Sequence, residues 1–381
     1  MLNEQYFSPC PRGLEAVLAS ELERCGASVV TAGGGGVRYS GTLETGYRVN
    51  LWSRVASRVL RQVAHAPYKT EQDVYALAHS VDWSKRFGVD RAIRVDVVGV
   101  KSPLKSLDFA TLRIKDAICD RFRDAVGRRP DVDTREPDVR VSAFLTATHA
   151  TLYFDLSGEP LFKRGYRREA GEAPLKENLA AGLVILSGWD GGTPFYDPMC
   201  GSGTIAIEAA LIARNIAPGL KRRFAFEQLG DFDAALWSRL RDDAQREQRK
   251  IPTGLIRASD IYGRVLERAR NAAALAGVDA DIVFDSLDVL EAHGHDRAGV
   301  LLTNPPYGVR VSERETLATL YPKLAAVLKS RFPGWRCYFF TADLELPKLL
   351  RLKESKRTPL FNGALECRMF EFKMVAGSNR A

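Results

Sequence analysis

The second half of the chain alternates between helical periodicity and short apolar runs, and no other feature limits the fold as strongly. From about residue 161, apolar residues recur at helical spacing in segments that are interleaved with strand-sized runs. Such alternation is typical of an α/β fold, a parallel sheet with helices on both faces. The predicted helices span 175–188, 204–214, 263–276 and 314–331, and the predicted strands lie near 194–197, 256–260, 282–284, 299–303 and 336–341.

The end of the chain departs from this alternation. Two strand-like stretches there flank Asn362-Gly363, a dipeptide that strongly favours a two-residue hairpin turn. The last two strands are therefore predicted to be antiparallel. A charged stretch over 231–250, between the second helix and the second strand, predicts an inserted helix. Its apolar side is formed by Phe232, Leu236 and Leu240.

The first 160 residues predict smaller α+β units. Helices are expected over 13–25 and 111–126, where apolar residues recur at helical spacing. Residues 92–100 alternate like a strand, and two further strands are expected to end at Leu156. The glycine run 33–36 is interpreted as a hairpin turn. Neither a helix start nor the Lys-Ser/Thr pair of a phosphate-binding loop follows it.

Composition restricts the class of protein and its partners. Lys and Arg outnumber Asp and Glu by 55 to 47, and the net charge of +8 favours a polyanionic partner such as RNA. The six cysteines form no CxxC pair, so neither a disulfide framework nor a metal site is expected. The start of the chain lacks a signal peptide, and no apolar stretch is long enough to cross a bilayer. A cytoplasmic protein without membrane contact is the expectation.

A cofactor loop is the most informative motif. The segment FYDPMCGSGTIAIEAALIA places a short strand, a glycine turn and an apolar helix in succession. Gly201 and Gly203 let the backbone pass close to a ligand, and the first N–H groups of the helix can bind its polar groups. A nucleoside triphosphate would require a Lys after Gly203, and none follows. A dinucleotide fits the glycine spacing formally, but Asp197 before the loop would repel its phosphates. S-adenosylmethionine, a cation without phosphates, suits this acidic residue better.

Acidic residues after the next two predicted strands extend this site. Asp260 ends the second predicted strand, where its carboxylate can accept hydrogen bonds from both hydroxyls of a ribose. Asp288 follows the third predicted strand and is the candidate for contact with an adenine amino group. Asp285 is its rival, and either of these two could be an ordinary surface carboxylate.

The tetrapeptide Asn304-Pro305-Pro306-Tyr307 follows the fourth predicted strand, at the sheet edge where open parallel sheets bind ligands. The Asn304 side-chain oxygen and the Pro305 carbonyl can both accept hydrogen bonds from one amino group of a base. These contacts stabilise the positive charge that grows on the nitrogen as a methyl group arrives. Tyr307 offers a ring face on which a flipped base can stack. No cysteine nucleophile lies in this loop, which argues against methylation of a ring carbon.

Taken together, these residues resemble the THUMP-containing RNA guanine-N2 methyltransferases, and within them the half of the bacterial 23S rRNA methyltransferases that forms N2-methylguanine. The likeness extends over nearly the whole chain, and its most specific part is the stretch GYRREAGEAPLKE joined to DPMCGSGT and NPPY. The other resembling segments are CPRGLEAVLASEL, LWSRVASRVL, RIKDAICDRF, DVRV and ASDIYGRVLERARNAAALAGV.

The resemblance implies a fold class and a domain order. We expect an α/β chain whose Rossmann-like class I methyltransferase domain, with a C-terminal antiparallel hairpin, follows an α+β ferredoxin-like domain and a THUMP RNA-binding domain. The expected domains span 1–62, 63–160 and 161–381. Such enzymes often carry a second, C-terminal methyltransferase that forms m7G. Because the chain stops at Ala381, it is expected to be either a stand-alone enzyme or one half of a longer one.

The motifs and the resemblance together give a set of expected site residues. The catalytic set is the tetrapeptide 304–307. The expected contacts of S-adenosylmethionine are Pro174, Leu175, Lys176, Asp197, Pro198, Met199, Gly201, Gly203, Thr204, Asp260, Ile261, Asp288 and Asn304. The basic residues expected to contact RNA phosphates are Arg113, Lys115, Lys163, Arg164, Arg167 and Arg168.

Methylation of guanine N2 in 23S rRNA is the leading hypothesis, and three alternatives stay open. Related enzymes of the same architecture act on tRNA, so the class of RNA is less certain than the chemistry. An adenine-N6 methyltransferase would use the same Asn-Pro-Pro-Tyr geometry on another amine. A catalytically idle RNA-binding assembly factor could retain the fold, although the intact cofactor loop and tetrapeptide argue against it.

Overall fold

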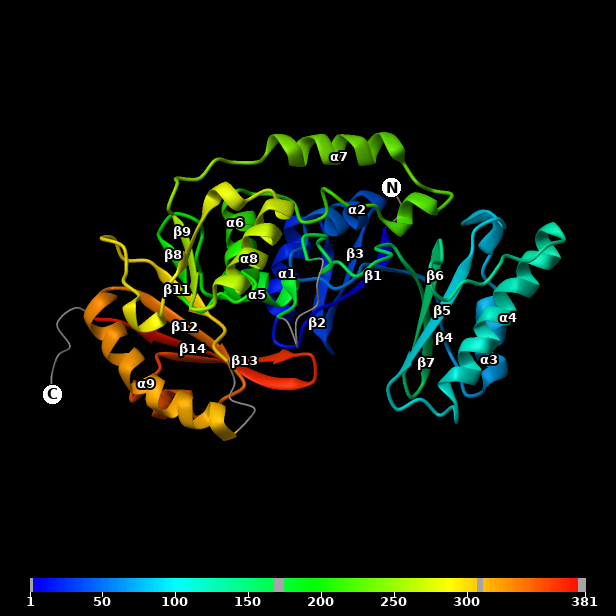
Figure 1. Cartoon of the computed structure of the whole chain (residues 1–381). Helices are drawn as coiled ribbons and strands as arrows, with labels where there is room; N and C mark the ends of the chain where they lie inside the picture. Colours follow the sequence, from blue (N-terminus) through cyan, green and yellow to red (C-terminus); the bar gives the residue numbers. More distant parts are fainter. Residues whose placement is uncertain (1–2, 168–174, 307–310, 376–381) are drawn as a thin grey trace. The chain divides into compact units, whose positions relative to one another are not determined.

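The computed structural model describes residues 3–167, 175–306 and 311–375, and its contacts form two compact units (Figure 1). The first unit comprises Met1–Pro9, Ala19–Leu161 and Arg222–Asp242, and the second comprises Cys10–Leu18, Phe162–Lys221 and Asp243–Ala381. The division therefore passes through helix α1 (Glu15–Arg24) and gives part of the predicted third domain to the first unit. The domain boundaries at 62 and 160 stay predictions.

The first unit is built on one seven-stranded sheet with the order β2-β3-β1-β4-β7-β6-β5. Only the pair β5–β6 is parallel. Strand β4 joins the two halves of the sheet, because it pairs with β1 at its start and with β7 along its length. The strands are β1 (Glu4–Pro9), β2 (Ser28–Gly33), β3 (Gly36–Gly41), β4 (Leu60–Pro67), β5 (Ile93–Gly99), β6 (Val139–Leu145) and β7 (His149–Asp155). Its helices include α2 (Leu43–Trp52), α3 (Glu71–His79) and α4 (Leu107–Val126), with a short 3-10 helix η1 (Trp83–Lys85).

Local capping signals set where these helices begin and end. Thr42 and Thr70 form capping boxes at the starts of α2 and α3. The side chain of Ser106 caps α4, so this helix begins four residues before the predicted start at Thr111, and it ends at Gly127, whose φ is +73°. The predicted turn in the glycine run is confirmed, because Gly33 and Gly36 close the β2–β3 hairpin.

The second unit contains a sheet with the order β10-β9-β8-β11-β12-β14-β13. The strands from β10 to β12 are parallel, and β14 is antiparallel to both of its neighbours. The antiparallel pairing of β13 with β14 confirms the hairpin predicted from Asn362-Gly363. The strands are β8 (Phe195–Asp197), β9 (Ile256–Asp260), β10 (Ile282–Ser286), β11 (Val300–Thr303), β12 (Arg336–Thr341), β13 (Lys356–Asn362) and β14 (Leu365–Lys373). The helices are α5 (Glu177–Leu186), α6 (Thr204–Ala213), α8 (Gly263–Ala276), α9 (Val311–Arg331) and α10 (Leu346–Leu350), with 3-10 helices η3 (Asp279–Asp281) and η4 (Val289–Glu291).

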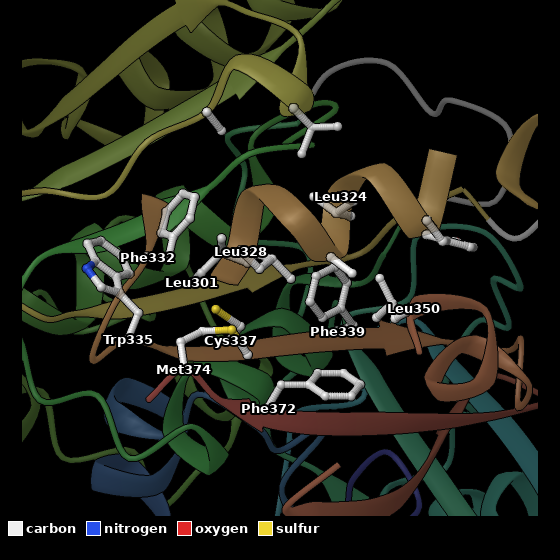
Figure 2. Packing of buried hydrophobic residues seen from close by; sticks show 14 of the residues in the cluster. Leu301, Leu324, Leu328, Phe332, Trp335, Cys337, Phe339, Leu350, Phe372 and Met374 are labelled. Atoms are coloured by element: carbon white, nitrogen blue, oxygen red, sulfur yellow. The ribbon is translucent and has the colours of Figure 1, made fainter. Parts of the chain in front are cut away.

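A dense apolar core lies where α9 packs on the central strands. Figure 2 shows Leu324 and Leu328 of α9 pointing toward Leu301 and Phe339 of the sheet. Phe339 in turn meets Phe372 of β14 edge to face, with 5.9 Å between ring centroids. These side chains are almost fully buried, so β11, whose end carries Asn304, rests on a tightly packed support.

The inserted segment differs from its prediction in extent and in contacts. Its helix α7 spans Ala234–Arg246, shorter than the predicted 231–250, and Phe232 lies before the helix. Leu240 is buried as expected, but the main anchor is Trp237, which the sequence analysis missed. Trp237 meets Phe226 edge to face at 5.1 Å, and Phe226, in the 3-10 helix η2 (Ala225–Gln228), stacks on Tyr47 at 4.3 Å. Aromatic packing therefore accompanies the assignment of Arg222–Asp242 to the first unit, whereas the end of α7 from Asp243 belongs to the second.

Candidate functional site

The sheet order of the second unit brings the predicted acidic and amide residues to one edge. Strands β9, β8 and β11 are consecutive neighbours and run parallel, and they end at Asp260, Asp197 and Thr303. Asn304 follows directly after Thr303. Because the carboxyl ends of parallel strands meet at the same edge, these side chains share the place where α/β sheets bind ligands.

Hydrogen bonds connect the ends of these three strands. The Thr303 hydroxyl donates to Asp197 Oδ1 at 2.8 Å, which ties the end of β11 to the end of β8. The Gly201 N–H donates to Asp260 Oδ2 at 3.0 Å, which ties the loop after β8 to the end of β9. The ends of β8, β9 and β11 are thus connected at this edge of the sheet.

The glycine loop has the conformation that its sequence requires. Gly201 and Gly203 have φ values of +52° and +77°, in the left-handed region where a side chain is strained. A Cβ at Gly203 would lie 3.0 Å from the Cβ of Ala269, so α8 also needs a glycine here. A Cβ at Gly201 would meet nothing within 4 Å, so this turn borders open space. The loop leads directly into α6 at Thr204.

Asp260 is half-buried and holds this loop through both of its carboxylate oxygens. Its Oδ1 accepts the N–H of Tyr262 at 3.1 Å, while its Oδ2 holds Gly201. Large apolar side chains follow it and remain open to solvent, with Ile261 at 57% and Tyr262 at 69% exposed. Ile261 belongs to the expected cofactor contacts, and Tyr262, which does not, is a similarly accessible aromatic side chain beside Asp260.

Asp197 is a buried carboxylate, 1% exposed. Burial raises its pKa from 3.8 to about 7, and nearby Asp260 adds to this, while hydrogen bonds from Thr303 and Met199 act in the opposite direction. A nearby cationic ligand would stabilise the ionised form of this carboxyl group. Burial also raises the pKa of the Cys200 thiol well above its usual value, which fits a packed thiol rather than a nucleophile.

The two rival carboxylates near β10 have different partners. Asp285 lies on β10 and pairs with Arg257 of β9 at 3.2 Å. Asp288 lies beyond β10, where its Oδ1 accepts the N–H of Leu290 at 2.9 Å and caps η4. Asp288 therefore uses one carboxylate oxygen for this helix cap, whereas Asp285 is paired with an arginine.

The tetrapeptide after β11 is described up to its third residue. Asn304 is half-buried, Pro305 is buried and Pro306 is exposed, while Tyr307 lies outside the described residues. Pro198 is buried and Met199 is half-buried on the neighbouring loop.

Two of the arginines expected to contact RNA occupy other places. The Arg164 side chain is 3% exposed, and its Nε donates to Glu208 of α6 at 3.4 Å. Arg167 Nη2 donates to the Thr204 hydroxyl at 2.6 Å and to the Leu175 carbonyl at 3.0 Å. Both guanidinium groups thus make protein contacts in the second unit, Arg164 with the buried Glu208 carboxylate and Arg167 with the Thr204 hydroxyl at the start of α6. Their contact with RNA phosphates stays a prediction.

The remaining expected residues fall into two groups. In the second unit, Lys163 is exposed, Leu175 is buried, and the Lys176 ammonium lies 4.8 Å from the ring centre of Phe162. Arg168 and Pro174 lie outside the described residues. On α4 of the first unit, Arg113 stacks over Tyr75 at 4.3 Å, and Lys115 contacts Asp116 at 2.8 Å.

The described residues contain neither a cluster of metal-ligating side chains nor a helix able to span a membrane. No group of three or more His, Cys, Asp or Glu side chains is arranged to hold a metal ion within residues 3–167, 175–306 and 311–375. In the same ranges, no helix combines the length and the apolar composition needed to cross a bilayer.

Comparison with protein families assigns a description to each part of the chain. Residues 164–371 match a family described as RMKL-like, methyltransferase domain. Residues 68–155 match the THUMP domain, and residues 5–60 match the RlmL ferredoxin-like domain.

Among curated proteins, the chain is similar to the ribosomal RNA large subunit methyltransferase K/L of Aeromonas hydrophila. The two are 40% identical over 395 residues, which is 98% of this chain and 55% of the relative. The protein of the same name from Psychromonas ingrahamii is 40% identical over 97% of this chain and 50% of its own length. The chain thus spans about half the length of the curated relatives that it matches.

Solved structures of similar size share the whole fold. SMU.472, solved as a complex with SAH, is 30% identical with a TM-score of 0.88, over 98% of this chain and 99% of that one. A protein from Listeria monocytogenes, described as a predicted N6-adenine-specific DNA methylase, is 32% identical with a TM-score of 0.90, over 98% and 97%.

Proposed function

Since the chain belongs to the family of RMKL-like methyltransferases, with a THUMP domain and an RlmL ferredoxin-like domain, we propose that it methylates the exocyclic N2 of a guanine in 23S rRNA, with S-adenosylmethionine as the methyl donor. The observation that carries this proposal is the sheet edge at which Asp260, Asp197 and Asn304 follow three adjacent parallel strands. The name of the Aeromonas relative supports ribosomal RNA as the substrate.

The residues at this edge fit S-adenosylmethionine. The positive charge of this cofactor would stabilise the ionised form of buried Asp197, whose pKa is about 7. Asp260 is placed to accept hydrogen bonds from the ribose, next to the exposed side chains of Ile261 and Tyr262. Asp288 is our candidate for the adenine amino group. The bound cofactor supplies an electrophilic methyl group. The other proposed contacts are Pro174, Leu175, Lys176, Pro198, Met199, Gly201, Gly203 and Thr204.

The tetrapeptide after β11 supplies the groups that act on the base. The Asn304 side-chain oxygen and the Pro305 carbonyl accept hydrogen bonds from the guanine amino group and stabilise the charge that develops there. No strong base is needed, because the nitrogen loses its proton only after it has become cationic. Tyr307 is proposed to stack on the flipped base.

The first half of the chain is proposed to bind RNA. Its ferredoxin-like and THUMP domains are assigned to 1–62 and 63–160, and the methyltransferase domain to 161–381. Arg113, Lys115 and Lys163 are the described basic residues proposed to contact phosphates, together with Arg168. We also propose a cytoplasmic location, where bacterial ribosomal RNA is modified.

Nucleoside mass spectrometry tests this function. We expect 23S rRNA from a strain lacking the gene to lose one N2-methylguanine, and the purified chain to restore it with S-adenosylmethionine. Parallel reactions should contain tRNA and adenine-containing DNA, because the Listeria structure carries an adenine-N6 description. Methylation of tRNA or of adenine N6 alone would replace the proposed substrate. Unchanged nucleosides in every RNA, with RNA binding retained, would favour an assembly factor.

A further inference from the structure

Arg167 connects the segment that ends at this residue to the start of α6, the helix that follows the cofactor loop. Its Nη2 donates to Thr204 Oγ1 at 2.6 Å and to the Leu175 carbonyl at 3.0 Å. Its Nη1 lies 3.9 Å from the Glu177 carboxylate. The side chain is only 17% exposed. A guanidinium with several partners at fixed distances is well suited to hold neighbouring groups in one arrangement.

The backbone that carries Arg167 is itself anchored on α6. Glu208 is fully buried at 0% exposure and accepts hydrogen bonds from Tyr166 Oη at 2.9 Å and from Arg164 Nε at 3.4 Å. Glu208 lies one helical turn after Thr204, on the same helix. The contacts of Tyr166 and Arg164 therefore fix the position from which Arg167 reaches the loop.

Thr204, which accepts a hydrogen bond from Arg167, also lies next to the exposed hydroxyl of Ser202 in the cofactor loop. Because Arg167 donates to Thr204 Oγ1, the hydroxyl hydrogen of Thr204 is available to another acceptor. Ser202 Oγ lies 3.3 Å away and is such an acceptor. Ser202 is exposed, so its hydroxyl is accessible and can donate its own hydrogen to a ligand. Arg167, Thr204 and Ser202 thus form a chain of donors that ends at the loop surface.

We propose that Arg167 is a positioning residue that, through Thr204, orients the Ser202 hydroxyl toward the carboxylate of the amino-acid portion of the cofactor. This inference rests on the proposed use of S-adenosylmethionine. That portion is a zwitterion, and its two charges need opposite surroundings. Buried Asp197 suits the positive end, whereas the positive charge of Arg167 and the Ser202 donor suit the negative end.

Binding of two related ligands separates this role from a purely structural one. S-adenosylhomocysteine carries the amino-acid portion, and 5′-methylthioadenosine lacks it. We expect Arg167→Ala to raise the Kd of S-adenosylhomocysteine about tenfold, from the loss of charge-assisted hydrogen bonding. The Kd of 5′-methylthioadenosine should change less than about twofold, because that ligand does not meet the carboxylate site. Arg246→Ala, which removes an arginine that is 72% exposed on α7, is the matched control and should leave both values unchanged.

A second variant keeps the test decisive if Arg167→Ala does not fold. Ser202→Ala changes an exposed side chain and should raise the Kd of S-adenosylhomocysteine alone. Arg167→Lys keeps the charge and should recover part of the loss, since one ammonium cannot reproduce the guanidinium contacts. Equal weakening of both ligands, or no weakening of S-adenosylhomocysteine by either alanine variant, would overturn the inference. If the wild-type protein binds neither ligand, the proposed function itself is wrong.

Discussion

Asp197 shows how one buried residue couples cofactor binding to pH. Its pKa of about 7 lies above the ordinary value of 3.8, so the folded protein binds this proton more tightly than the unfolded chain does. The stability that this group contributes is therefore present at low pH and is lost as the pH rises through about 7. A cationic ligand favours the ionised form and lowers the pKa again.

We accordingly expect S-adenosylmethionine to release protons when it binds at a pH about one unit below the pKa of Asp197. Calorimetry in two buffers with different heats of ionisation measures this release as a difference in apparent binding enthalpy. Asp197→Asn cannot ionise, so the difference should shrink in that variant. Equal enthalpies of the wild-type protein in both buffers would show that Asp197 does not respond to the ligand.

Asp260 is expected to contribute more to affinity than an ordinary surface carboxylate. Asp260→Ala removes the proposed ribose acceptor and also the contact that holds Gly201, so the Kd of S-adenosylmethionine should rise by about one to two decades. Asp279→Ala serves as control, because Asp279 is exposed and precedes β10, at the opposite edge of the sheet. Calorimetry that finds the same affinity in both variants would remove Asp260 from the ribose site.

Asn304 is expected to act on the rate rather than on cofactor binding. Its oxygen is proposed to stabilise charge that exists only during methyl transfer, so Asn304→Ala should keep most of the cofactor affinity. Turnover should fall by about 10²–10³, as for the loss of one preorganised hydrogen bond in other enzymes. Single-turnover assays on 23S rRNA, with cofactor binding measured alongside, provide the measurement. A normal rate in this variant would show that the tetrapeptide has no catalytic role and serves only as the turn after β11.

At the scale of elements, the second unit depends on a close approach between the start of α1 and helix α5. A Cβ added at Gly182 of α5 would overlap the Leu14 side chain, which is fully buried. Gly182→Ala should therefore lower the free energy of unfolding by about 1–3 kcal/mol through overpacking. Leu14→Ala alone should cost about 2–5 kcal/mol because it leaves a cavity.

The double variant tests whether these two costs have one cause. An alanine at position 14 makes room for the methyl group at position 182, so the combined loss should be smaller than the sum of the single losses. Urea unfolding followed by circular dichroism gives the three values. Strict additivity would mean that Leu14 and Gly182 do not share this contact in solution.

At the scale of the whole molecule, the net charge of +8 should make RNA binding depend on salt. Arg113 and Lys115 of α4 are the candidates in the first unit, and removing both should reduce the slope of log K against log salt by about two units. Arg164 is buried against Glu208, so its replacement should affect folding before it affects that slope. Titrations at several salt concentrations, with Arg246→Ala as control, measure the slope. An unchanged slope would place the RNA contacts elsewhere.

Sequence patterns were sufficient to predict the order of the elements in the second unit, the positions of Asp197, Asp260 and Asn304 at or after strand ends, and the antiparallel hairpin at the chain end. These features follow from local rules. Helical and strand periodicity, glycines with positive φ, and the Asn362-Gly363 turn all act within a few residues. Since the carboxyl ends of parallel strands meet at one edge, the order of the motifs was sufficient to predict that their residues converge.

The partners of several charged and aromatic side chains became known only from the folded chain. Arg164 and Arg167 look like phosphate ligands in the sequence, but their partners Glu208 and Thr204 lie 44 and 37 residues further along the chain. The stretch 222–242 joined the first unit through Phe226 and Tyr47, which are far apart in the sequence. Such pairings depend on which elements become neighbours when the apolar surfaces are buried. Local periodicity does not encode this choice, because it identifies a buried face without identifying what covers it.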